Sequence, residues 1–303
     1  MRITNFTELM ASTGRLQDAV QALDRSRLDI STGVRIHNIS DDPTSGGQLI
    51  QIGSTLRSIE QYRRNITVAT SRSDIEEQTL NGLSDTLARA SELATAQSSS
   101  TASAQTRLII KGEVDSLLEH AIDLSNTRFG DYYIFGGTRS NEKPFQMPTT
   151  PGGPFSALTD ALGNSVNPSG GVPVEISAGR YVTPNHSGTE VFIDTGVFNA
   201  LKALSTALGN NDQTAIKASA ATLQTAGVSV QSLIAQQGSR GSTYGEAGDA
   251  LDSMELSLKT FRSDLQDTDV EKTVTTMAGR QTQYQAAMAA TARILGMSLV
   301  NYL

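Results

Sequence analysis

The sequence predicts a mostly α fold: a long antiparallel helical rod or coiled coil formed by both chain termini, with a small β-rich domain inserted in the middle. Two observations carry this prediction. Apolar residues recur at heptad spacing near both ends, and glycines and prolines gather in the middle. Intervals of seven residues, split as four and three, place apolar side chains on one narrow stripe of an α-helix. Aromatic residues make up only 5% of the 303 residues, which suits thin helical packing better than a thick core.

The first element is a helix expected over residues 5–35. Its apolar stripe has two rows. Leu9, Leu16, Leu23 and Ile30 recur every seven residues in one row, and Val20 lies in the alternate row between them. The polar residues Thr13 and Arg27 interrupt that alternate row, and polar positions in such a stripe fix register and partner number at some cost in stability. The apolar residues of this predicted assembly face are Leu9, Leu16, Val20, Leu23 and Ile30.

A loop then leads into a second helix. Asp42 directly before Pro43 is a helix start signal, because the carboxylate accepts hydrogen bonds from free amides and proline at the first helical position sacrifices none. Helical periodicity continues to about residue 96. The serine-rich run 97–103 ends it, since serine hydroxyls compete for backbone hydrogen bonds. A shorter helix is expected after that run, over about residues 108–124.

The character of the chain changes after this short helix. Residues 130–137 form an aromatic run bounded by glycines, which predicts a strand. Seven of the eight prolines follow before about residue 194, together with the β-like runs 172–176 and 190–193. These observations predict a small β-rich domain over residues 131–194.

Helices return after the insert. They are expected over residues 197–208 and 212–237 and, after a turn at 238–241, over 247–265. The predicted division of the chain is therefore terminal coiled-coil assembly segments (1–40 and 268–303), an α-helical rod domain (41–130 and 195–267) and the β-rich inserted domain (131–194).

The last helix has a clear start and a second apolar stripe. Thr268 and Glu271 match a capping box, in which the two side chains satisfy backbone amides reciprocally. The stripe follows steps of four and three and is interrupted by the polar Gln281. Its predicted assembly face comprises Val274, Met277, Tyr284, Met288, Leu295 and Leu299.

Composition and spacing argue against several classes of function. A net charge of −7 argues against a nucleic-acid binder, which needs a basic face. Without cysteine there is no disulfide or thiolate metal site, and His37, His120 and His186 lie far apart in the sequence. The acidic clusters at 41–42 and 267–271 are interpreted as helix caps rather than calcium sites. We expect no catalytic residue, no metal, no cofactor and no enzymatic activity.

The beginning of the chain lacks the features of a signal peptide. Residues 1–15 have no basic start, no apolar run and no small-residue cleavage site. No stretch approaches the roughly 20 consecutive apolar residues that a membrane-spanning helix needs. We therefore expect no membrane partner and no cleaved signal.

Three segments resemble a known family. Residues 30–36, followed by Asp41, Asp42 and Pro43, resemble the N-terminal signature of bacterial flagellins and their relatives. Residues 267–269, leading into a glutamine- and alanine-rich heptad helix, resemble the corresponding C-terminal signature. Residues 126–138, with Pro144 and Phe145 shortly after, resemble the hook–filament junction proteins (the hook-associated protein 3 family) rather than flagellin itself. The resemblance covers most of the chain and is weakest between residues 147 and 188.

The resemblance implies a structural protein of the extracellular bacterial flagellum, located at the hook–filament junction. Such proteins are exported unfolded through the flagellar type III apparatus without a cleaved signal. The expected partners are further copies of the chain in a ring of the axial structure, flagellin on the distal side and another hook-associated protein on the proximal side. A cytoplasmic export chaperone is expected at the C-terminal helix. In the ring, the terminal helices would pair in an inner core and bury their stripes against each other and against neighbours.

Two other functions remain open at the level of sequence. A flagellin, the filament subunit itself, would share both ends, so the aromatic run 132–137 and the β-rich insert discriminate between the two. A secreted effector or adhesin with coiled-coil ends would use the middle domain to bind a ligand, but residues 147–188 contain no recognisable binding motif.

Overall fold

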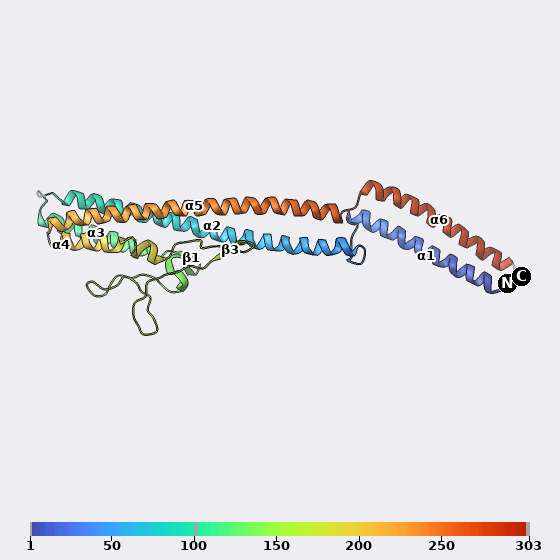
Figure 1. Cartoon of the computed structure of the whole chain (residues 1–303), viewed down its shortest axis with the longest axis horizontal. Coiled ribbons are helices and arrows are strands. Elements are labelled where there is room, and N and C mark those ends of the chain that lie inside the picture. Colours follow the sequence, from blue (N-terminus) through green and yellow to red (C-terminus); the bar gives the residue numbers. More distant parts are fainter. Residues whose placement is uncertain (1, 100–101, 301–303) are drawn as a thin grey trace. The chain divides into compact units, whose positions relative to one another are not determined.

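The computed structural model describes residues 2–99 and 102–300, and the side chains of residues 7, 10–99 and 102–293. Within these ranges the protein is mostly α (Figure 1), and the predicted fold class, with long terminal helices and a small sheet region in the middle, is confirmed. The α-helices are α1 (Arg2–Thr32), α2 (Pro43–Gln97), α3 (Ala104–Ser125), α4 (Val197–Gly209), α5 (Gln213–Gln266) and α6 (Val270–Val300).

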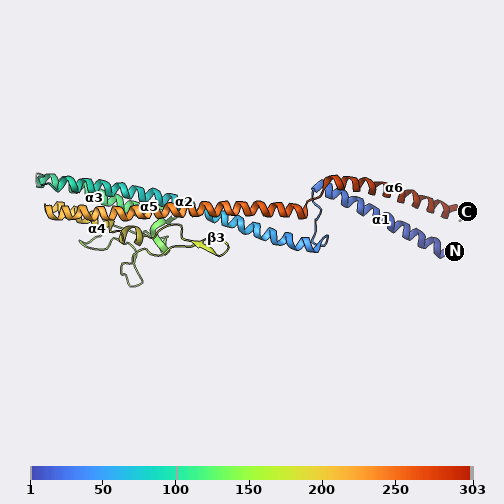
Figure 2. The ribbon, with the colours of Figure 1, turned by 45° about the horizontal axis from the view of Figure 1, so that its top comes forward.

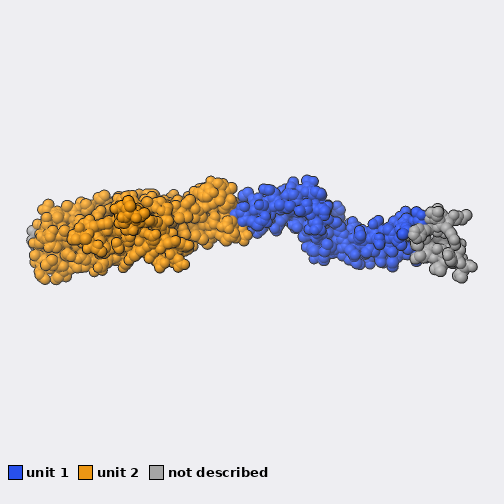
Figure 3. Space-filling view, turned by 90° about the horizontal axis from the view of Figure 1, so that it is seen from below, with its two compact units in different colours: residues 1–58, 253–303 blue, residues 59–252 orange. Residues whose placement is uncertain are grey.

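The chain forms two compact units, which Figure 3 colours separately. Unit 1 comprises residues 1–58 and 253–303, and unit 2 comprises residues 59–252, so the division falls inside α2 and α5. In unit 1, α1 and α6 lie side by side in both Figure 1 and Figure 2 and run antiparallel. The division into three domains that the sequence suggested stays a prediction.

The predicted helix boundaries around α2 and α3 are confirmed. α2 begins at Pro43, and the Asp42 carboxylate accepts a hydrogen bond from the Ser45 N–H at 3.1 Å. α2 ends at Gln97, within the serine-rich run. Ser103 then caps α3, since its hydroxyl accepts a hydrogen bond from the Thr106 N–H at 3.1 Å. Polar side chains thus set these boundaries through local hydrogen bonds.

Unit 2 has an extensive apolar core. Leucine, alanine and valine side chains of α2, α3, α4 and α5 pack together, and phenylalanines from the middle of the chain join them. The Phe192 and Phe198 rings stack with centroids 5.3 Å apart, and Phe145 meets them edge-on at 5.4 and 5.3 Å. Aromatic pairs of this kind add stability beyond the area they bury, so the insert is fastened to α4 by its aromatic side chains.

The aromatic run 130–137 is a strand only at Tyr132–Tyr133. β1 (Arg128–Phe129) and β2 (Tyr132–Tyr133) form an antiparallel hairpin whose turn contains Gly130 at φ +59°. The 3₁₀-helix η1 (Ile134–Arg139) follows. The prediction of one strand was wrong beyond β2 because the consecutive residues Ile134 and Phe135 are both buried, whereas consecutive residues of a strand face opposite sides.

The second predicted β-like run, at 190–193, is also not a strand. It forms the short π-helix η2 (Thr189–Ile193). The Glu190 carboxylate accepts a hydrogen bond from the Ser187 N–H at 2.7 Å, and the Ser187 hydroxyl accepts one from the Glu190 N–H at 3.3 Å. This reciprocal capping box favours a helical turn. The other run does form a strand, β3 (Val174–Ser177), which pairs antiparallel with β4 (Arg180–Val182).

The turn predicted at 238–241 is absent, because α5 is continuous from Gln213 to Gln266. Gln237 and Tyr244 lie one heptad apart across the glycines, and both side chains are buried. The Gln237 side-chain amide donates hydrogen bonds to the Ser73 hydroxyl at 2.7 Å and to the Pro184 carbonyl at 3.2 Å. Anchoring this helix face outweighs the cost of about 1 kcal/mol for each interior glycine.

One described segment, Thr189–Gly209, is long and apolar enough to cross a membrane by length and composition. It comprises η2 and α4, separated by Gly196 at φ +73°. Its large side chains, such as Phe198 and Leu201, are fully buried in unit 2. We therefore assign this segment to the protein core.

A buried hydrogen-bonded pair ties the loop before η2 to α2. The Nδ1 atom of His186 lies 2.8 Å from Oε1 of Glu76, and the His186 backbone N–H donates to the same oxygen at 3.1 Å. The two residues are 2% and 0% exposed. Removing one member of such a pair leaves a buried polar group without its hydrogen-bond partner.

We predict that His186→Leu lowers the free energy of unfolding by about 1–3 kcal/mol, because the Glu76 side chain stays buried without its imidazole partner. Denaturant unfolding followed by near-ultraviolet circular dichroism measures the change. The double variant Glu76→Leu with His186→Leu recovers most of the loss, since neither polar side chain remains. A single variant as stable as the parent would contradict this account of the pair.

Candidate assembly interface

The antiparallel α1–α6 pair contains the predicted assembly residues of both termini. Buried and half-buried positions recur on each helix at steps of four and three, so each helix turns one narrow face inward. On α1 these positions are Ser12, Leu16, Ala19, Leu23, Ser26 and Ile30. On α6 they are Thr273, Met277, Arg280, Tyr284, Ala287 and Thr291.

Each predicted stripe consists of two rows of residues that recur every seven positions. One row of each stripe lies on the inward face, and the other row does not. Leu16, Leu23, Ile30, Met277 and Tyr284 lie on the inward face as expected. The second row of inward residues lies one residue earlier than predicted, so the interrupting residues Thr13, Arg27 and Gln281 are exposed rather than in the seam. The side chains of Leu9, Leu295 and Leu299 lie outside the described residues.

The second row of inward residues consists of small and polar side chains, some of which form hydrogen bonds between the two helices. The Arg280 guanidinium of α6 donates from Nη1 to the Ala22 carbonyl at 2.7 Å and to the Ser26 hydroxyl at 2.6 Å. Closer to the N-terminus, the hydroxyls of Ser12 and Thr291 are 2.8 Å apart. Charge-assisted hydrogen bonds are stronger than neutral ones, so Arg280 fixes how the helices align. The small residues Ser12, Ala19 and Ser26 recur at intervals of seven, but they lack the apolar signal that makes a helix stripe visible in a sequence.

The residues displaced from the seam form an exposed apolar face. Val20, Val274 and Met288 are 36%, 45% and 49% exposed. Among described residues, the buried hydrophobic side chains that unit 1 contributes are only Leu23, Ile36 and Ile52. Its other exposed large hydrophobic residues are Met10, Leu28, Ile39, Ile50, Met254, Leu256, Phe261 and Val270. Contiguous exposed apolar patches mark protein contact surfaces, so the exposed residues beside the seam are candidates for such a surface.

Backbone pairing joins the end of α1 to the segment between α5 and α6. Val34 and Asp267 form an antiparallel bridge, in which the Arg35 N–H donates to the Gln266 carbonyl at 2.8 Å and the Thr268 N–H donates to the Gly33 carbonyl at 2.9 Å. Gly33 has φ +71°, which glycine adopts without strain. We call residues 33–36 and 265–268 the terminal joint.

The terminal joint also corrects the predicted start of α6. The cap is Asp269, whose carboxylate accepts a hydrogen bond from the Lys272 N–H at 3.0 Å, rather than the predicted Thr268. Thr268 pairs through its backbone with Gly33 and is thereby held in the joint. The next residue therefore takes the capping position.

The acidic residues of the loop after α1 act through hydrogen bonds. The Asp41 carboxylate accepts from the N–H groups of Asn38 at 2.9 Å and His37 at 3.0 Å, and it pairs with Arg25 at 2.8 Å. The Asn38 N–H and the Arg25 guanidinium lower the pKa of Asp41. Hydrogen bonds from the Ser45 hydroxyl and N–H likewise lower the pKa of Asp42. Asp42 is thus the helix cap that the sequence predicted, whereas Asp41 orders the loop before α2 and caps no helix.

We predict that Arg280→Ala loosens the α1–α6 pair while unit 2 stays intact. The variant loses the two charge-assisted hydrogen bonds, each worth about 1.5–3 kcal/mol. Far-ultraviolet circular dichroism should show an early melting transition from unit 1 that shifts to lower temperature, and an unchanged later transition from unit 2.

Lys272→Ala is the matched control, because it removes one positive charge from an exposed position of the same helix. It should leave both transitions in place. Equal shifts in the two variants would show that Arg280 acts only through its charge and not through the contacts to Ala22 and Ser26.

Comparison with known proteins agrees with this geometry at both ends of the chain. Residues 3–140 match the bacterial flagellin N-terminal helical region, and residues 220–303 match the bacterial flagellin C-terminal helical region. The chain is 25% identical over 297 residues to flagellar hook-associated protein 3 of Escherichia coli (strain K12), a match that covers 89% of each chain.

Solved structures share the fold. Bacillus cereus FlgL has a TM-score of 0.57 at 22% identity, over 70% of this chain and 98% of that one. Flagellar hook associated protein-3 from Legionella pneumophila has a TM-score of 0.60 at 14% identity, over 71% of this chain and 98% of that one. The relatives support a structural role in the bacterial flagellum. Because the two flagellin regions together account for both helical ends, the chain belongs to the flagellin family.

Proposed function

We propose that this chain is a non-enzymatic structural protein that joins hook-side proteins to the flagellin filament. The observation that carries the proposal is the exposed apolar face of the terminal helix pair, represented by Val20, Val274 and Met288. Similarity to proteins named flagellar hook-associated protein 3 supports the junction rather than the filament as the location. The flagellin filament subunit remains the alternative.

The proposed mechanism is coupled folding and assembly. An isolated terminal helix is marginal in water, and among the described residues the α1–α6 pair adds few buried hydrophobic side chains to stabilise it. In a ring of copies, Val20, Val274 and Met288 would contact neighbouring helices, and each Å² of apolar surface removed from water would contribute about 25 cal/mol. Flagellin would dock on the distal side, and another hook-associated protein on the proximal side. The predicted assembly residues Leu9, Leu295 and Leu299 are proposed to take part in the same assembly.

The same weakness suits export. A segment that gains its stability from neighbours remains easy to unfold in the cytoplasm, which the flagellar type III apparatus requires. The chain would leave without a cleaved signal and fold outside the cell, at the hook–filament junction. A cytoplasmic chaperone would cover the C-terminal helix until then. Unit 2, with its own core, does not depend on neighbours to bury its apolar side chains.

The test is deletion of the gene in its host, followed by electron microscopy of the cells and immunoblotting of the medium for flagellin. We expect hooks without filaments and monomeric flagellin in the medium, because exported subunits have nothing to attach to. Loss of filaments with no flagellin outside would identify the chain as the filament subunit instead. Normal filaments in the deletion strain would contradict both assignments.

Complementation of this strain tests the apolar face. Val274→Asp and Met288→Asp should fail to restore filaments, because a charge replaces an apolar contact while the inward seam is unchanged. Leu162→Asp is the matched control, since Leu162 is an 87% exposed apolar residue of unit 2 and its variant should restore filaments. Restoration by all three variants would refute the role of Val274 and Met288 in assembly.

A further inference from the structure

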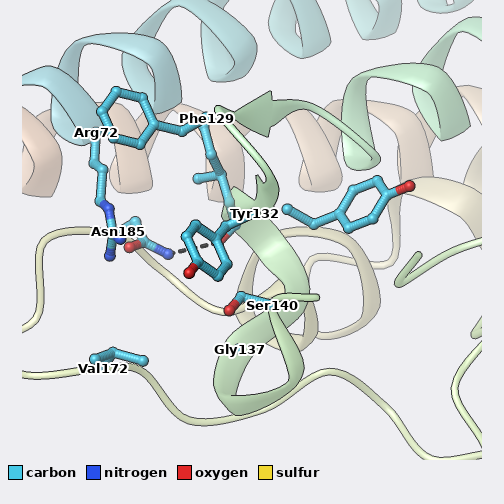
Figure 4. Close-up of a pocket in the computed structure, with 9 residues that line it drawn as sticks. Arg72, Phe129, Tyr132, Gly137, Ser140, Val172 and Asn185 are labelled. Carbon is cyan, nitrogen blue, oxygen red and sulfur yellow. Dashed lines mark hydrogen bonds between the residues drawn. The ribbon is translucent and has the colours of Figure 1, made fainter. Parts of the chain in front are cut away.

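A pocket of about 250 Å³ lies in unit 2 beside the β1–β2 hairpin (Figure 4). Arg72 of α2 contributes one wall, and the aromatic residues Phe129, Tyr132 and Tyr133 contribute another. Ser140 and Val172 lie around the remaining sides in Figure 4. Binding pockets for drug-sized ligands start at about 300 Å³, so this pocket suits a group the size of one amino-acid residue.

The pocket contains one cation without a counter-charge. Arg63 and Arg64, on the same helix, pair with Asp252 and Glu60. The Arg72 guanidinium instead lies over the Phe129 ring, with its central carbon 5.8 Å from the ring centroid, and forms no ion pair with a described carboxylate. No aspartate or glutamate is among the described residues that line the pocket. The chain as a whole carries a net charge of −7, so a pocket lined by one cation and no carboxylate differs in charge from the rest of the protein.

The placement of Arg72 indicates the class of ligand. Among the described contacts, the Arg72 guanidinium contacts the Phe129 ring and donates no hydrogen bond, so its N–H groups remain available to a ligand. These groups match the two oxygens of a carboxylate, which they bind in a bidentate manner. Phosphate would bring a second negative charge, which the single cation does not balance. The aromatic walls then suit the aliphatic part of an acidic side chain.

The walls are fixed before a ligand arrives. The Asn185 side-chain amide donates to the Ile134 carbonyl at 2.6 Å, and the Tyr133 N–H donates to the Ser140 carbonyl at 2.7 Å. Gly137, at φ +61°, approaches the neighbouring loop so closely that a Cβ atom there would lie 2.3 Å from the Ser169 carbonyl oxygen. A preformed pocket loses less conformational entropy on binding.

We propose that this pocket binds the carboxylate of an aspartate or glutamate side chain on a protein partner, with Arg72 as the principal contact. Two rim residues indicate a protein segment rather than a free acid: Tyr132 is 48% exposed and Val172 is 50% exposed. A free acid that fills the pocket leaves this apolar rim in water, whereas the residues flanking an acidic side chain cover it. The site is separate from the terminal helix pair and does not rest on the proposed junction function.

The probes are N-acetylglutamate amide, its neutral analogue N-acetylglutamine amide, and the tripeptide Ac-Leu-Glu-Leu-NH₂, titrated into the full chain and followed by NMR. The glutamate probe should bind with a dissociation constant on the order of 1 mM and shift the Arg72 Nε–H resonance. The glutamine probe should shift nothing at the same concentration. No saturable shift with the glutamate probe up to about 50 mM, or equal shifts with both probes, overturns the proposal.

The tripeptide distinguishes the two sources of the carboxylate. Its leucines can cover Tyr132 and Val172, so it should bind about tenfold more tightly than the single residue. If N-acetylglutamate amide binds at least as tightly as the tripeptide, the pocket is a site for a free organic acid and the assignment to a protein partner is wrong.

Variants of Arg72 complete the test. Arg72→Gln should abolish binding of both acidic probes, and Arg72→Lys should weaken it, because a lysine keeps the charge but loses the bidentate geometry. Arg64→Gln is the control, since it removes the same charge from an exposed position on the same helix. Circular dichroism checks that each variant is folded. Unchanged affinity in folded Arg72→Gln overturns the role of Arg72.

Discussion

The structure depends on a simple constraint: a pair of antiparallel helices can bury only one face of each helix. In the described part of the α1–α6 pair, that face alternates apolar side chains such as Leu23 and Met277 with small or polar ones such as Ser26 and Arg280. The apolar side chains of Val274 and Met288 are exposed to solvent. The hydrogen bonds of the pair therefore align the two helices, while their apolar side chains are only partly buried. Neighbouring helices can bury the remaining apolar surface.

Unit 2 meets the same constraint in another way. There α3 and α4 cover α2 and α5, and the phenylalanine cluster around Phe192 closes the core. The buried pair of Glu76 and His186 fastens the insert to α2. A unit of this kind can keep its fold while the terminal helices change partners. The contrast between a self-sufficient unit and an incomplete one is the physical basis of the proposed assembly mechanism.

Local signals in the sequence predicted the start of α2 and the break before α3, because Asp42 and the serine-rich run 97–103 act within a few residues. These local signals gave wrong predictions where contacts between residues far apart in the sequence determine the structure. The glycines near 238 do not break α5, since Gln237 and Tyr244 are anchored by unit 2. The run 130–137 leaves strand geometry because Ile134 and Phe135 both enter the core. On each helix, one of the two predicted rows of inward residues lies one position later than the observed row. The sequence pattern follows large apolar residues, and it does not reveal the hydrogen bonds of Arg280.

The central claim is that the terminal helices are stabilised by neighbours, whereas unit 2 is stable alone. Hydrogen–deuterium exchange of the purified monomer tests this claim most directly, because amide protection reports local stability along the chain. The account predicts that amides of α1 and α6 exchange far faster than those of α3 and α4, and that they become protected on assembly. Equally slow exchange in all four helices of the free monomer would contradict it.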